Sequence, residues 1–120
     1  MSAGVITASD RDRLSQACAL LRRYGICATG GVSGEPAEIR RRLGGALLDR
    51  FPDGACSYAF WTSDAATAFD GNGTLVRPLV LHYNGPPVAR AVRAALAEHR
   101  LGVTEGPEPL TLLVEPDAVP

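Results

Sequence analysis

The stretch that decides the fold reads ICATGGVSGEP, residues 26–36. Its short apolar start, residues 26–29, predicts a buried β-strand. The glycine-rich run at 30–34 then breaks regular structure. Glu35-Pro36 opens a helix, because proline is tolerated in the first helical turn, where its missing N–H is not needed. A strand that leads through a tight connection into a helix is typical of a domain in which helices pack on a central sheet.

Helices and strands continue to alternate on both sides of this stretch. Upstream, Ser9 and Asp12 form an S-x-x-D capping pattern at the start of a helix that Gly25 ends. Downstream, the periodicity predicts a helix to residue 51, a strand at 55–61, a short helix at 65–69, a strand at 74–83, a helix from Pro86-Pro87 to residue 101, and strands at 103–105 and 110–114. Pro78 cannot donate a ladder hydrogen bond, so the strand at 74–83 is expected to be bulged or to lie at a sheet edge.

The order α-β-α-β-α-β-α-β-β predicts an α/β fold, with an α+β arrangement as the alternative. We expect a single domain with a central mixed β-sheet of about five short strands, three main helices and one short helix. Residues 9–116 are expected to form this globular α/β domain. A flexible N-terminal lead at 1–8 and a frayed tail at 117–120 are expected to flank it.

Charge and composition argue against several classes of partner. The 12 basic and 13 acidic residues give a net charge of -1, so neither nucleic acid nor an anionic membrane surface is an expected partner. No run approaches the roughly 18 consecutive apolar residues that a membrane span needs, and the N-terminus lacks the pattern of a signal peptide. We therefore expect a cytoplasmic protein.

The cysteines and histidines do not follow a disulfide or metal pattern. Cys18, Cys27 and Cys56 are odd in number and lack C-x-x-C spacing, which argues against a disulfide framework and against a zinc site. His82 and His99 are the only histidines, and they do not show H-x-x-H or H-E-x-x-H spacing. No metal and no cofactor is expected.

The glycine-rich run is a candidate ligand-binding loop. Its candidate residues are Gly30, Gly31, Ser33 and Gly34, with Tyr83 from a later strand. The loop precedes a helix N-terminus, where free backbone N–H groups and the helix dipole can hold a small anionic ligand. It lacks the lysine of a P-loop and the G-x-G-x-x-G spacing of a dinucleotide site. A tight connection between strand and helix is the alternative interpretation.

The composition also allows one constellation for covalent catalysis. Cys27 or Cys56 would supply the nucleophile and His82 the base. An acid such as Asp64 would orient the imidazole. The alternatives are structural: cysteines are common core residues, and Asp64 follows Thr62-Ser63 at a helix start, where it is expected to cap the helix.

Two further side chains are candidates for a contact surface. Trp61 ends a strand, where its ring either seals the core or presents an interface. Arg77 occupies one of the alternate positions of the strand at 74–83 that otherwise carry mainly apolar side chains. Helical geometry separates successive residues by about 100 degrees, so the run Arg40-Arg41-Arg42 spreads around its helix axis and is expected to lie mostly on the solvated face.

Several groups of residues carry a resemblance to known proteins. They are LRRYGI at 21–26, YAFW at 58–61 followed by Asp64 and Ala68, G-x-G-x-L at 71–75, and Val88-Ala89, Val92, Ala95-Leu96 and Leu101-Gly102-Val103 near the end. With these residues the sequence resembles an uncharacterised family of small domains from high-GC Gram-positive bacteria. The resemblance covers most of the chain and supports the domain boundaries without implying a catalytic residue. The family usually carries an aromatic-histidine pair where this chain has Phe60-Trp61-Thr62.

The absence of metal, nucleotide and triad patterns favours a noncatalytic interaction or regulatory module. Such a module would act as a homodimer or would bind a protein partner. The alternative is a small enzyme, or a protein that binds a small molecule or anion. It would use the loop at Gly30–Gly34 with Cys27, His82 or Tyr83 nearby.

Overall fold

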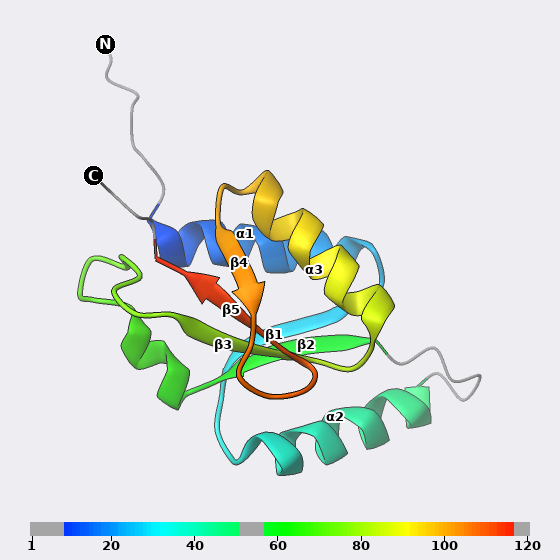
Figure 1. The fold of residues 1–120 in the computed structure, drawn as a ribbon. Helices are drawn as coiled ribbons and strands as arrows, with labels where there is room; N and C mark the ends of the chain where they lie inside the picture. The colour runs from blue at the N-terminus through cyan, green and yellow to red at the C-terminus, as the bar shows by residue number, and fades with distance from the viewer. Residues whose placement is uncertain (1–8, 51–56, 117–120) are drawn as a thin grey trace.

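The computed structural model describes residues 9–50 and 57–116. Along the chain it contains α1 (Asp10–Arg23), β1 (Cys27–Val32), α2 (Pro36–Arg50), β2 (Tyr58–Thr62), the short 3-10 helix η1 (Asp64–Ala68), β3 (Leu79–Tyr83), α3 (Pro86–Glu98), β4 (Gly102–Glu105) and β5 (Thr111–Glu115). The predicted fold class, the single domain and the order of elements are confirmed (Figure 1). The predicted lead at 1–8, the predicted tail at 117–120 and Cys56 lie outside the described residues.

The strands form one mixed sheet in the order β1-β2-β3-β5-β4. β1 and β2 are parallel and are joined by α2, since parallel neighbours need a crossover connection. The other neighbouring pairs are antiparallel. α2 lies on one face of the sheet, and α1 and α3 lie on the other (Figure 1). The sheet therefore separates two helical layers of unequal size.

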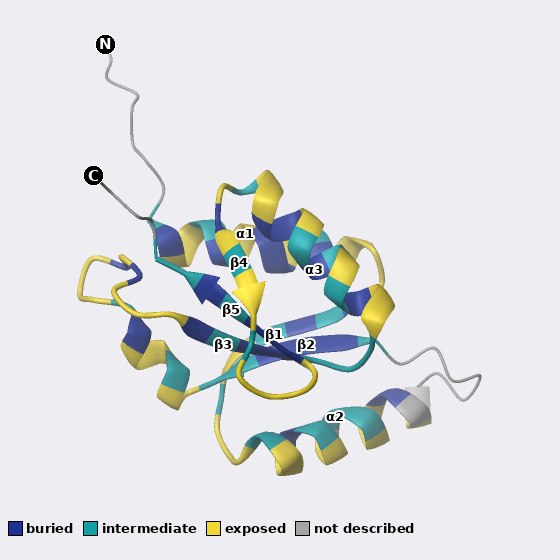
Figure 2. Cartoon of the chain, viewed as in Figure 1, coloured by how far each residue is buried: buried dark blue, intermediate teal, exposed yellow. Residues whose placement is uncertain are grey.

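The sheet face under α1 and α3 carries the larger core. Successive side chains of a strand point to opposite faces, so Ala59 of β2, Leu81 of β3 and Leu112 of β5 share this side. They meet the buried stripes of the two helices (Figure 2), which include Leu14, Ala17 and Leu21 of α1 and Val88, Val92 and Leu96 of α3. Because burial of apolar surface is the dominant favourable term in folding, this layer supplies most of the hydrophobic stabilisation.

The sheet face under α2 carries a smaller core. Its buried members are Ile39 and Leu47 of α2 with Tyr58 and Phe60 of β2. Beyond β2, the same face continues with His82 of β3 and Thr111 of β5, which are paired neighbours and both buried. Polar side chains therefore enter the interior on this face only where the apolar cover of α2 ends.

The start of α1 confirms the predicted cap. Ser9 Oγ accepts a hydrogen bond from the N–H of Asp12 at 3.1 Å, which satisfies a donor that the helix leaves unpaired. Asp10 is buried, pairs with Arg13 and accepts a hydrogen bond from the N–H of Leu75 at 2.7 Å. The first turn of α1 thus anchors the segment that leads into β3.

The predicted end of the first strand is wrong. β1 continues through Gly30 and Gly31 to Val32, and its register against β2 shifts between Thr29 and Val32. One extra residue on β1 makes this a β-bulge, in which glycine is common because it accepts the positive φ of +67° seen at Gly31.

Two other local predictions are also wrong. β3 lies between β2 and β5 and is no edge strand; it begins at Leu79, so Pro78 stays outside the ladder and removes none of its hydrogen bonds. The N-cap residue of η1 is Ser63, whose side chain makes no capping bond, while Thr62 Oγ1 accepts a hydrogen bond from the N–H of Ala65 at 3.3 Å. Asp64 is instead the first residue of η1.

Candidate functional site

The structure does not assemble the covalent constellation that the composition allowed. Cys27 lies on β1 and His82 on β3, and β2 runs between them with Tyr58 and Phe60 on the same face. Asp64 is exposed in η1 beyond the end of β2. Cys56 lies outside the described residues. Cys27, Asp64 and His82 therefore do not form a catalytic group in this arrangement.

The glycine-rich loop has structural tasks that its sequence does not reveal. A Cβ atom at Gly30 would lie 2.0 Å from the Trp61 ring, so the ring packs closely against the β1 backbone. Gly34 adopts a φ of +122°, which side chains other than glycine rarely accept. The Ser33 carbonyl accepts a hydrogen bond from Arg42 Nη2 at 2.8 Å. These contacts fit the interpretation of the loop as a tight connection.

Tyr83 does not join His82 on one surface. The two residues are neighbours on β3, so their side chains point to opposite faces of the sheet. The Tyr83 ring packs against the core under α1 and α3, whereas His82 stacks on Phe60 under α2. Only the backbone of Tyr83 approaches the α2 side, where its carbonyl accepts a hydrogen bond from Arg40 at 2.6 Å.

His82 instead forms the floor of a cleft between the start of α2 and the loop that joins β4 to β5. We call this hollow the His82 cleft; its lining includes Glu35, Ala37, Arg40, His82, Glu108 and Thr111. Its volume is about 470 Å³, which lies within the usual range of roughly 300–1,000 Å³ for small-molecule sites. These residues come from distant parts of the sequence and meet only in the fold.

The imidazole of His82 is buried, with 6% of its surface exposed. It stacks on Phe60 at a ring separation of 4.8 Å and an interplanar angle of 16°. Burial and the nearby Arg40 guanidinium lower the pKa of His82, while the charge of Glu108 acts in the opposite direction. The ring is therefore neutral at pH 7 and offers one N–H donor and one acceptor. Among the residues that the structure describes, neither ring nitrogen makes a hydrogen bond, and neither is completely buried.

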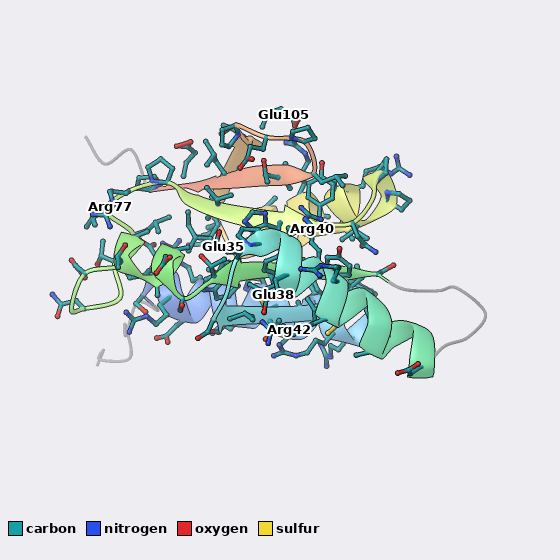
Figure 3. The ribbon with its side chains drawn as sticks, turned by 90° about the horizontal axis from the view of Figure 1, so that it is seen from below. Glu35, Glu38, Arg40, Arg42, Arg77 and Glu105 are labelled. Atoms are coloured by element: carbon teal, nitrogen blue, oxygen red, sulfur yellow. The ribbon has the colours of Figure 1, made fainter. Side chains whose placement is uncertain are left out.

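Arg40 is the fixed positive charge of the His82 cleft. Its Nη1 donates to the carbonyl of Tyr83 at 2.6 Å and its Nη2 to the carbonyl of Leu110 at 3.0 Å. The prediction that Arg40 lies on the solvated face of its helix is wrong: it is half-buried and reaches across β3, whereas Arg42 extends from the opposite side of α2 (Figure 3). A guanidinium has more N–H donors than these contacts use, so Arg40 can also bind a ligand.

The loop between β4 and β5 is held in one shape beside the cleft. Thr111 Oγ1 donates to the Glu108 carbonyl at 2.5 Å and accepts from the Glu108 N–H at 3.2 Å. A Cβ atom at Gly106 would lie 2.1 Å from Thr111 Oγ1, so glycine permits this close approach. Leu110 has a φ of +61°, and its carbonyl accepts from both Arg40 and the N–H of Tyr83. The loop therefore presents Glu108 on a preformed wall.

A second hollow lies on the opposite side of the sheet, between α1 and η1. We call it the Trp61 groove; it has a volume of about 270 Å³ and its lining includes Arg11, Cys18, Arg22, Gly30, Trp61 and Phe69. The Arg11 guanidinium lies 5.2 Å from the centre of the Phe69 ring, and Arg22 donates to the Ala28 carbonyl at 2.7 Å. Burial raises the pKa of the Cys18 thiol to about 11, against a smaller opposing effect of Arg22, so this thiol is protonated at neutral pH.

The two predicted interface residues have different environments. Trp61 is half-buried and packs against the larger core. Arg77 is exposed, and its guanidinium donates to the carbonyl and hydroxyl oxygens of Thr67. Their roles in association stay a prediction.

Within residues 9–50 and 57–116, no group of His, Cys, Asp and Glu side chains is placed to hold a metal ion, and no helix is long and apolar enough to cross a bilayer.

Arg40, Glu108 and Thr111 were not predicted as site residues. The helical position of Arg40 does not reveal how far its long side chain reaches. Glu108 lies between Pro107 and Pro109 in a proline-rich turn, and Thr111 follows it; this turn gives no binding signal by itself. Only the pairing of β3 with β5 brings that turn beside His82.

Comparisons with protein-family models, with curated proteins and with solved structures give no match for this chain. The resemblance of the sequence to an uncharacterised family of small bacterial domains therefore stays an expectation.

Proposed function

We propose that this chain is a noncatalytic regulatory module that binds a small zwitterionic molecule, such as a free amino acid, in the His82 cleft. The observation that carries the proposal is the largely buried imidazole of His82, which lines this cleft and makes no hydrogen bond with the described residues. Its ring nitrogens are not sealed from the cleft, so one can donate to a ligand and the other can accept from it.

The charges of the cleft favour a ligand that carries both signs. Arg40 lies beside the N-terminus of α2, and both attract a carboxylate. Glu35 and Glu108 line the same cleft and attract an ammonium group. A simple anion would meet repulsion from the two glutamates, and a simple cation would meet repulsion from Arg40. A zwitterion satisfies both sets.

The geometry supports binding more than covalent catalysis. The described thiols, Cys18 and Cys27, do not lie beside His82: Cys18 belongs to the opposite face and Cys27 is separated from His82 by β2. The neutral imidazole is suited to accept or donate one hydrogen bond to a ligand. A small enzyme that acts on the bound molecule is the alternative function of the same cleft.

NMR of the two histidine rings tests the proposal directly. Each free proteinogenic L-amino acid is added at millimolar concentration to the full chain, and the ring C–H signals of His82 and His99 are followed. We expect at least one amino acid to shift the His82 signal saturably while the His99 signal stays in place. A His99→Gln variant assigns the two signals. If no amino acid moves the His82 signal, the proposal is wrong.

Matched charge variants test the assigned groups. Glu108→Gln and Glu35→Gln should each weaken binding of the amino acid by about tenfold, because each removes one charge-assisted contact worth roughly 1.5 kcal/mol. Glu98→Gln on α3 is the control, since Glu98 is exposed and lies outside the cleft. Equal affinities for all three variants would contradict the assignment. Binding of the amide of the same amino acid with unchanged affinity would also contradict it, since the amide lacks the carboxylate.

The proposed module is cytoplasmic, which the near-neutral charge and the free thiols of Cys18 and Cys27 support. A homodimer or a protein partner remains part of the proposal, with Trp61 and Arg77 as its predicted contacts. Light scattering across micromolar concentrations tests it. A monomer at every concentration, with and without the amino acid, would contradict the homodimer.

A further inference from the structure

We infer that the Trp61 groove is a second binding site, whose ligand is a small planar aromatic carboxylate such as a benzoate. The inference does not rest on the His82 cleft, because the two hollows lie on opposite faces of the sheet and share no lining residue.

One wall of the groove is a single stripe of α1. Arg11, Ser15, Cys18 and Arg22 all line the groove, and positions separated by three or four residues share one face of a helix. The two arginines lie at the ends of this stripe, with the small side chains of Ser15 and Cys18 between them. The wall is therefore positive at its ends and uncharged in the middle.

The facing wall is aromatic. It contains Trp61 at the end of β2 and Phe69 just after η1. Gly30 lets the Trp61 ring pack against the β1 backbone, because a Cβ atom there would overlap the ring at 2.0 Å. A ring held in this way offers a face or an edge for offset stacking with a second aromatic ring.

The charge of the groove is of one sign. Its lining contains Arg11 and Arg22 and no Asp or Glu, in contrast to the His82 cleft, which carries Glu35 and Glu108. Neither Arg11 nor Arg22 forms an ion pair within the described part of the chain. Arginine binds carboxylates through paired N–H donors. The groove therefore selects an anion where the His82 cleft does not.

The size and the floor of the groove restrict the ligand further. A volume of about 270 Å³ suits a ligand with one ring better than a nucleotide or a peptide. Cys18 is buried and protonated at neutral pH, so it gives the floor a neutral, weakly polar contact. The two arginines lie about 16 Å apart along α1, so one carboxylate contacts only one of them. These features together point to an aromatic ring that enters against Trp61 and a carboxylate that stays at Arg11, beside Phe69.

Trp61 is the only tryptophan of the chain, so its fluorescence reports on the groove without any label. The full chain is titrated with benzoate, with benzamide and with cyclohexanecarboxylate. We expect a saturable change with benzoate and an apparent affinity at least tenfold lower for the other two, since benzamide lacks the charge and cyclohexanecarboxylate lacks the aromatic ring. An absent benzoate response, or equal responses to benzoate and benzamide, would overturn the inference.

Charge variants locate the carboxylate. Arg11→Gln should weaken benzoate binding by about tenfold, because the guanidinium of Arg11 contacts the Phe69 ring and keeps its donors for the ligand. Arg90→Gln, at an exposed position on α3, should leave the affinity unchanged. Circular dichroism checks that both variants are folded. Wild-type affinity in Arg11→Gln, or equal weakening in Arg90→Gln, would overturn the inference.

Discussion

The two faces of the sheet differ in how completely helices cover them. Under α1 and α3, every strand contributes apolar side chains to one continuous core. Under α2, the apolar cover ends at β2, and β3 and β5 place His82 and Thr111 beside an open cleft. One layer thus provides stability, while the other leaves buried polar groups within reach of a ligand. The comparison shows that a small domain can hold a polar site when a second face carries most of its core.

The largest expected effect is the difference in stability lost when a leucine is truncated in each of the two cores. Leu112→Ala removes a fully buried side chain from the larger core and should lower the free energy of unfolding by about 3 kcal/mol. Leu47→Ala, at the 9% exposed end of the smaller core, should cost about 1–2 kcal/mol, since α2 can move to close the space. Urea denaturation measures both. Equal decreases in the free energy of unfolding would contradict the difference between the two faces.

Alanine substitutions at two glycines, one on β1 and one on α2, also distinguish the two sides of the sheet. Gly30→Ala places a methyl group inside the Trp61 ring, so the free energy of unfolding should fall by about 2 kcal/mol and the tryptophan emission should change. Gly44→Ala in α2 meets open space and should raise stability by about 0.5–1 kcal/mol, because alanine favours the helix. Thermal unfolding compares the two variants. If Gly30→Ala were as stable as Gly44→Ala, the packing of Trp61 on β1 would be incorrect.

Helix capping gives a smaller difference. Ser9→Ala removes the side-chain cap of α1 and should cost about 1 kcal/mol. Ser63 precedes η1 without a side-chain hydrogen bond to it, so Ser63→Ala should leave the unfolding free energy within about 0.5 kcal/mol of the wild type. Denaturant midpoints measure both variants. A neutral Ser9→Ala would show that α1 does not depend on its cap.

The smallest expected effect is a pH dependence on the α2 face. The pKa of His82 is lowered in the folded protein, so below the unfolded value of about 6.5 the unfolded chain binds more protons than the folded chain. The contribution of His82 to stability is therefore fully present above that pH and is lost as the pH falls from there toward the folded pKa. Between pH 8 and pH 5, unfolding curves should show a larger decrease in the free energy of unfolding for the wild type than for His82→Gln. The same loss in both proteins would contradict this origin.

The sequence allowed the fold to be predicted more fully than the site. Helical and strand periodicity reports which residues face a core, so the order of elements, the central sheet and the Ser9 cap were correct. The extension of β1 through Gly30 depended on pairing with β2, which local propensity does not contain. The sequence shows that Pro78 cannot join a ladder of hydrogen bonds, but it does not show that β3 begins directly after this proline.

The site was only partly accessible because its members meet through tertiary contacts. His82 could be singled out as a histidine near a strand end. Arg40 and Glu108 could not be joined to it, because they lie on α2 and on the loop before β5, and neither spacing nor composition shows that these segments converge. The glycine loop gave a stronger local signal, but its glycines serve the close packing of Trp61 and the turn into α2.

The central claim is that His82 is a buried, neutral imidazole at the floor of an open cleft, and NMR titration of its ring tests this claim most directly. The His99→Gln variant leaves His82 as the single titrating ring. We predict a midpoint below the ordinary histidine pKa of about 6.5, because burial and Arg40 both disfavour the charged ring. A midpoint at or above that value would mean that the imidazole is solvated or paired with an acid, and it would contradict the account.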